Sequence, residues 1–158
     1  MTYRIIALDL DGTLLDRQKR ILPESLAALA DARAQGIKVV IVTGRHHVAI
    51  HPFYQALQLD TPAICCNGTY LYDYQARKVL TSDPLDPVKA KKVVDLLEYH
   101  GIHGLLYVDD AMLYQQPSGH VSRSIAWGQT LPEHQRPNII QVNSLREAAD
   151  EARSVWKF

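Results

Sequence analysis

Hydrophobic and polar positions in the first half of the chain alternate between short apolar runs and amphipathic stretches. Residues 3–8 are almost continuously apolar, which predicts a central parallel strand covered on both faces. Residues 23–35 begin with Pro and are followed by Gly, which predicts a helix, and the β-branched run 37–42 predicts a second strand. A proline-kinked helix over 47–57 and a third strand over 63–66 complete the pattern. This rhythm predicts an α/β fold with a doubly wound parallel sheet.

The rhythm changes after the third strand. A small hairpin is expected over 69–72 and 78–80, and the Pro- and Asp-containing stretch 82–87 is a composition break. We place a domain boundary there, with residues 1–82 in one domain and residues 83–158 in a second, α+β domain. The elements expected in the second domain are a helix from Pro87 closed by Gly101, a hairpin of 105–108 and 112–114, a strand over 139–142, a helix capped by Ser144 and a strand over 155–158. The polar, Pro-containing stretch between the hairpin and the later strand predicts no regular element.

Composition narrows the functional classes. The chain has 158 residues, 47% of them hydrophobic, which is enough for one core or one core with a small appendage. Lys and Arg number 17 and Asp and Glu 17, a balance that argues against nucleic-acid binding. No apolar run approaches the roughly 20 residues of a membrane span, and no signal peptide is evident, so a soluble, cytoplasmic protein is expected. The adjacent Cys65 and Cys66 are expected to be buried, reduced thiols.

Two carboxylates stand where the first strand ends, in the run Asp9-Leu10-Asp11-Gly12-Thr13. Because side chains alternate along a strand, Asp9 and Asp11 project to the same side, and Gly12 permits a sharp turn after them. Two acids so close together gain from a shared cation or a shared proton. This pattern favours a catalytic pair over an ordinary Asx-type turn.

The next two strands also end in polar or Gly-containing steps, Thr43-Gly44-Arg45 and Asn67-Gly68. Because the carboxyl ends of parallel strands line the ligand crevice of an open sheet, the three clusters are expected to meet in space. The hydroxyl and backbone amides at Thr43-Gly44 suit an anionic oxygen. Arg45 is expected to contact either the substrate or a core carboxylate.

Two further groups of side chains carry weaker signals. His46, His47 and His51 follow the second cluster without a neighbouring cysteine, which favours contact with solvent or substrate over a metal site. The three alternating tyrosines in 70–74 are typical of a half-exposed strand and require no ligand.

These motifs resemble the haloacid dehalogenase superfamily of phosphatases, and in particular its Cof-type branch. Asp9–Thr13 matches the first motif of that superfamily, and Thr43–Gly44 matches the second. Asn67–Gly68 falls where the branch inserts a cap domain. The resemblance implies that residues 1–82 are the first part of a Rossmann-like core, and that residues 83–158 are the first part of an α+β cap.

The resemblance also implies a role for each motif residue. Asp9 would attack phosphorus and form an aspartyl-phosphate, and Asp11 would protonate the leaving oxygen and then activate water. Mg²⁺ would bind the Asp9 carboxylate and the Asp11 backbone carbonyl. The phosphate-binding groups would be Leu10, Thr43 and Gly44, and the substrate contacts Arg45, Asn67 and Gly68. The implied substrates are small phosphorylated metabolites, pyridoxal phosphate first and sugar phosphates second.

Two later motifs of the superfamily, a lysine beyond the cap and a Gly-Asp followed by Asn-Asp, do not occur in this sequence. The chain therefore resembles an N-terminal fragment with little or no activity, whose open sheet edge invites self-association. Two other interpretations stay open. One is a non-catalytic remnant that binds phosphate or a partner, and the other is a phosphotransferase or mutase, because a hydroxyl can also intercept a phospho-aspartate.

Overall fold

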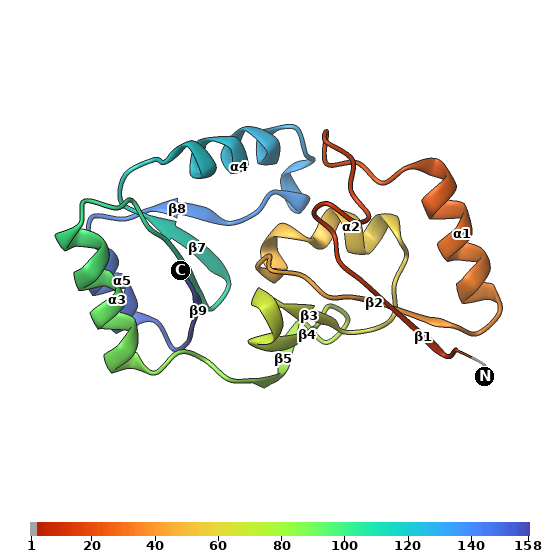
Figure 1. The fold of residues 1–158 in the computed structure, drawn as a ribbon, viewed down its shortest axis with the longest axis horizontal. Coiled ribbons are helices and arrows are strands. Elements are labelled where there is room, and N and C mark those ends of the chain that lie inside the picture. The colour runs from red at the N-terminus through yellow and green to blue at the C-terminus, as the bar shows by residue number, and fades with distance from the viewer. Residues whose placement is uncertain (1–2) are drawn as a thin grey trace. The chain divides into compact units, whose positions relative to one another are not determined.

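The computed structural model describes residues 3–158, and the chain divides into two compact units at Ser82–Asp83 (Figure 1). The elements of the first unit are β1 (Ile5–Leu8), α1 (Pro23–Ala34), β2 (Lys38–Ile41), a 3₁₀ turn (His47–Ala49), α2 (His51–Ala56), β3 (Ala63–Cys65), a second 3₁₀ turn (Cys66–Gly68), β4 (Tyr70–Asp73) and β5 (Lys78–Ser82). The α/β class expected from the sequence is confirmed, and each predicted strand of this half is present.

Parallel pairing organises the start of the first unit. β1 pairs with β2 in parallel, in a register that sets Ile5 opposite Lys38 and Leu8 opposite Ile41. A parallel bridge between Val42 and Ile64 continues the arrangement to β3, after which β4 and β5 follow in antiparallel order. The carboxyl ends of β1, β2 and β3 therefore lie along one edge.

The expectation that the first strand is covered on both faces is wrong for the described residues. β1 alternates between exposed and half-buried positions, and the Ile5 side chain is 62% exposed. Within residues 3–158, β1 pairs along its length with β2 alone, and no residue of α1 is buried. An apolar strand is covered only where other elements pack on it, and α1 provides little cover here.

The second unit has its own sheet and core. Its elements are α3 (Pro87–Tyr99), β6 (Leu105–Val108), β7 (Ala111–Tyr114), α4 (Gly119–Gln129), a 3₁₀ turn (Glu133–Gln135), β8 (Ile139–Gln141), α5 (Leu145–Glu151) and β9 (Val155–Lys157). The strand order is β8-β7-β6-β9, with only the β7–β8 pair parallel. Helices α3 and α5 lie side by side (Figure 1), and Val94, Leu106 and Leu145 are buried together between them and the sheet.

Side-chain caps explain where the helices of the second unit begin. The Asp86 carboxylate accepts hydrogen bonds from Val88 N at 3.0 Å and Lys89 N at 3.1 Å, and starts α3. Ser118 accepts from Val121 N at 3.3 Å and starts α4, the helix that the sequence did not predict. The prolines and polar residues of this stretch argued against a helix, although it contains a short amphipathic segment with a serine cap.

No helix within the described part of the chain is both long enough and apolar enough to span a membrane.

The core of the second unit provides a test of the packing. Leu106 on β6 is fully buried, whereas Leu96 on α3 is 58% exposed. We expect Leu106→Ala to lower the free energy of unfolding by about 2–5 kcal/mol, because it leaves a cavity. Leu96→Ala is the matched control and should change it by less than about 0.5 kcal/mol. Urea denaturation measures both, and equal effects would contradict the packing described here.

Candidate active site

The loop after β1 turns tightly around a buried leucine. The Leu10 carbonyl accepts backbone hydrogen bonds from Thr13 at 3.3 Å, Leu14 at 3.1 Å and Leu15 at 2.9 Å. The Leu10 side chain is fully buried, while Asp9 and Asp11 on either side of it are exposed. Burial of Leu10 therefore anchors the loop and turns the two acids toward solvent.

Backbone hydrogen bonds tie the loops after β2 and β3 together. Thr43 N donates to the Ile64 carbonyl at 2.9 Å, and Asn67 N donates to the Thr43 carbonyl at 3.0 Å. Cys66 N donates to the Arg45 carbonyl at 3.0 Å. Thr43 is buried, and its hydroxyl oxygen accepts from Arg45 N at 3.2 Å. The second and third predicted clusters are thus neighbours in the structure.

The backbone of the loop after β3 is strained at the residues that form these hydrogen bonds. Cys66 and Asn67 have φ values of 50° and 61°, in the left-handed region that non-glycine residues rarely occupy, and Gly68 follows at 95°. Such conformations cost about 1–3 kcal/mol each and persist only where the surroundings hold them. Here the hydrogen bonds from Cys66 N and Asn67 N to the β2 loop hold them.

An ion-pair cluster joins the first loop to the second. Arg45 donates from Nε to Asp11 Oδ2 at 2.5 Å and from Nη2 to Asp11 Oδ1 at 2.8 Å, a two-pronged contact. Lys19 Nζ also donates to Asp11 Oδ1, at 2.5 Å. Arg45 is held from behind by a bond to the Ala49 carbonyl at 3.3 Å and by the Phe53 ring, 5.2 Å from the guanidinium carbon. Of the two partners expected for Arg45, the structure shows a carboxylate, that of Asp11.

The two cations control the protonation of Asp11. Hydrogen bonds from Arg45, and secondarily from Lys19, hold the pKa of the Asp11 carboxyl well below its usual range, although partial burial acts in the opposite direction. Asp11 is therefore ionised at neutral pH in this arrangement. A role as proton donor requires that Arg45 and Lys19 first loosen their contacts with it.

Two of the three histidines after Arg45 are not where the sequence placed them. His46 and His47 are buried, so the expectation that they contact solvent or substrate is wrong. The Tyr70 hydroxyl lies 3.0 Å from His47 N and 2.8 Å from His47 Nδ1, and Tyr74 donates to the His47 carbonyl at 2.5 Å. The His47 ring also stacks on Tyr72, with centroids 3.8 Å apart. The alternating tyrosines form one face that fixes the turn directly after Arg45.

Burial also sets the chemistry of nearby groups. Desolvation lowers the pKa of His47 to about 4, so its ring is neutral at neutral pH. Cys65 and Cys66 are free and buried, as expected, and burial raises the pKa of the Cys65 thiol. Neither group is placed to act as a nucleophile.

The oxygen atoms at the end of β1 suit a hard cation. Arg45 and Lys19 occupy the Asp11 carboxylate, and the exposed Asp9 carboxylate is the nearest other acid in the sequence. Mg²⁺ binds through one or two carboxylates and keeps several waters, and the exposed Asp9 carboxylate is a ligand of this type. Among residues 3–158, no group of three or more His, Cys, Asp or Glu side chains is arranged to hold a metal by itself.

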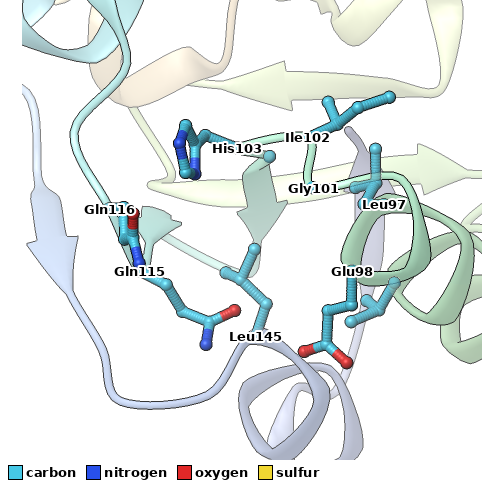
Figure 2. Close-up of a pocket in the computed structure, with 10 residues that line it drawn as sticks. Leu97, Glu98, Gly101, Ile102, His103, Gln115, Gln116 and Leu145 are labelled. Carbon is cyan, nitrogen blue, oxygen red and sulfur yellow. The ribbon is translucent and has the colours of Figure 1, made fainter.

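The second unit contains a separate cavity of about 210 Å³ (Figure 2). Leu97 and Leu145 contribute apolar lining, and Glu98, His103 and Gln115 contribute polar lining. In Figure 2, Leu145 lies between the side chains of Gln115 and Glu98. None of the residues that the sequence singled out for chemistry lines this cavity.

Comparison with known proteins establishes the class of this chain. The sequence model of the haloacid dehalogenase-like hydrolase family matches residues 6–158, and the chain belongs to that family. It is 63% identical, over all of its 158 residues, to pyridoxal phosphate phosphatase YbhA of Escherichia coli. It is 36% identical over 115 residues, 70% of its length, to the 5-amino-6-(5-phospho-D-ribitylamino)uracil phosphatase YitU of Bacillus subtilis. The family resemblance predicted from the motifs is confirmed.

A solved structure shares the fold. A haloacid dehalogenase-like hydrolase from B. subtilis matches with a TM-score of 0.76 and 25% identity, over 96% of this chain and 57% of that one. The chain spans 58% of the E. coli phosphatase and 42% of the B. subtilis phosphatase YitU. It therefore corresponds to about half the length of the relatives it matches.

The burial of His47 predicts a pH-dependent stability. The His47 pKa is about 4 in the folded state against 6.5 for an ordinary histidine, so the unfolded chain binds the extra proton first as pH falls. Its contribution is complete above pH 6.5 and is lost toward pH 4, which amounts to roughly 3 kcal/mol.

Urea denaturation between pH 7 and pH 4 measures this effect. We expect His47→Gln to have a shallower pH dependence of the free energy of unfolding than the unsubstituted chain. His134→Gln, at an exposed position, is the control and should retain the original dependence. The same slope in His47→Gln and the unsubstituted chain would refute the assignment.

Proposed function

We propose that this chain carries the nucleophile, the acid–base residue and phosphate-binding groups of a Mg²⁺-dependent phosphomonoester phosphatase. The observation that carries the proposal is the meeting of Asp11 with Arg45, which joins the loop after β1 to the loop after β2. The 63% identity to the E. coli pyridoxal phosphate phosphatase supports pyridoxal phosphate as the first candidate substrate, and other small phosphorylated metabolites as the wider class.

The two acids have different surroundings, which supports different roles. Asp9 is exposed at the end of β1, where its carboxylate oxygen can attack phosphorus and form an aspartyl-phosphate while the ester oxygen leaves. Once released from its cations, Asp11 takes up a proton from solvent and gives it to that leaving oxygen, and it later takes a proton from the water that opens the intermediate. Arg45 and Lys19 hold Asp11 ionised until substrate arrives, so proton transfer depends on release of these contacts.

The loops after β1, β2 and β3 supply groups for the phosphoryl oxygens. The Thr43 hydroxyl accepts from Arg45 N, which orients its own O–H toward another acceptor. The backbone amides of Leu10 and Gly44 are further donors in this proposal. Asn67 and Gly68, tied to Thr43 through Asn67 N, stand as substrate contacts.

Mg²⁺, when bound by the Asp9 carboxylate and the Asp11 carbonyl, supplies positive charge against the negative charge of the phosphoryl group. The residues of the chain do the rest of the work: Asp9 provides the attacking oxygen, and Thr43 and Arg45 orient the group under attack.

The division of the chain at Ser82–Asp83 supports a division of labour. We assign residues 1–82 to the catalytic core and residues 83–158 to a cap. A cap that closes over a phosphoryl-transfer site excludes water and selects the leaving group.

The proposal is tested with the chain alone and with the chain continued after Phe158 by the C-terminal segment of the E. coli phosphatase. We expect the extended chain to release inorganic phosphate from pyridoxal 5′-phosphate in a Mg²⁺-dependent reaction. Asp9→Asn removes the nucleophile and should lower the rate by at least about 10³-fold. Asp60→Asn is the matched control, because Asp60 forms an exposed ion pair with Lys38 at 2.8 Å, and it should retain the rate.

Failure of the extended chain to hydrolyse any of a broad panel of phosphate esters would contradict the proposal. Reaction in ¹⁸O-labelled water distinguishes a hydrolase from a phosphotransferase. Label in the released phosphate supports a hydrolase, and transfer of phosphate to an added alcohol supports a phosphotransferase.

A further inference from the structure

A hydrogen-bonded turn over residues 16–20 places Lys19 at the candidate active site. The Asp16 carboxylate accepts hydrogen bonds from Gln18 N at 2.8 Å and Arg20 N at 2.9 Å, and Lys19 N donates to the Asp16 carbonyl at 3.0 Å. Within this turn Lys19 has a φ of 60°, a left-handed conformation that a lysine rarely adopts. Strained residues of this kind cluster at functional sites, where the surrounding bonds hold them in place.

The strained turn gives Lys19 a specific partner. Lys19 Nζ contacts the same oxygen of Asp11, Oδ1, that accepts a bond from Arg45 Nη2. One carboxylate thus holds two cations that come from different loops. The Lys19 side chain is 44% exposed and the Asp11 side chain 40% exposed, so solvent and solutes reach the cluster.

The charges of this cluster allow a phosphate group to replace the Asp11 carboxylate as the partner of Lys19 and Arg45. Asp11 offers one negative charge to Lys19 and Arg45, whereas a phosphate group carries more negative charge on several oxygens and can meet both cations at once. Both side chains of the Lys19–Asp11 pair are partly exposed to solvent, which weakens the pair, so an anion of higher charge can displace the carboxylate.

We propose that Lys19 is a phosphate-binding residue of this site, and that an entering phosphate group displaces the Asp11 carboxylate from Lys19 and Arg45. This inference rests on the proposed function, since it concerns the same site. It adds a cation from residues 16–20, outside the motifs that define the family resemblance. It also gives Asp11 a way to leave its two cations when substrate arrives.

The test measures binding of inorganic phosphate to the 158-residue chain in the presence of Mg²⁺, by isothermal titration calorimetry. A charge-assisted hydrogen bond lost in Lys19→Met should weaken binding by about 10- to 100-fold. Lys19→Gly removes the same charge and also suits the left-handed backbone, so it keeps the test valid if Lys19→Met folds poorly. Lys19→Arg retains the charge and should retain most of the affinity.

Lys38→Met is the matched control. Lys38 forms a lysine–aspartate pair of similar exposure with Asp60, at the amino end of β2, so its loss removes one positive charge away from the site. Its affinity for phosphate should equal that of the unsubstituted chain.

Two other results would overturn the inference, and they differ in their meaning for the proposed function. If Lys19→Met and Lys19→Gly bind phosphate as tightly as the unsubstituted chain while Arg45→Met loses affinity, Lys19 has no role and the proposed phosphate site stands. If the unsubstituted chain binds no phosphate, the role of Lys19 fails together with the phosphate site assigned to this chain.

Discussion

Parallel pairing of β1 with β2 is the constraint on which the candidate site depends. The pairing continues past the strand ends, because Val42 N donates to the Leu8 carbonyl at 2.8 Å, and it brings the two following loops to one edge. Asp11 and Arg45 are 34 residues apart in sequence, yet they meet there through two hydrogen bonds. An antiparallel arrangement would place one of the two loops at the opposite end of the sheet.

The side chains of the ion-pair cluster at that edge are held in fixed positions and are also accessible to solvent. Arg45 is fixed by Ala49 and Phe53 behind it, so its two-pronged contact sets the position of the Asp11 carboxylate. The buried contacts of His47 with Tyr70 and Tyr74 hold the turn that follows Arg45, and so help to fix the position of Arg45. The front of the cluster is open to solvent, which leaves it accessible to an anion.

Local patterns explain which features could be predicted from the sequence. The apolar runs of β1, β2 and β3, and the acids or Gly-containing steps after them, are contiguous in the chain, so the class of fold and the candidate residues could be derived from them. The burial of His46 and His47 could not, because it depends on tyrosines that follow more than 20 residues later. The contact of Lys19 with Asp11 could not be predicted either, because the position of Lys19 depends on the turn that the Asp16 carboxylate closes.

The exposure of β1 links the stability of the first unit to its chemistry. The second unit buries Leu106 and its neighbours in a core of its own, whereas Ile5 on β1 remains 62% exposed. Asp9 directly follows this strand, so any element that pairs with the open edge of β1 or covers Ile5 would also restrict the backbone that carries the nucleophile proposed here. The stability of β1 and the position of Asp9 are therefore linked through one continuous stretch of backbone.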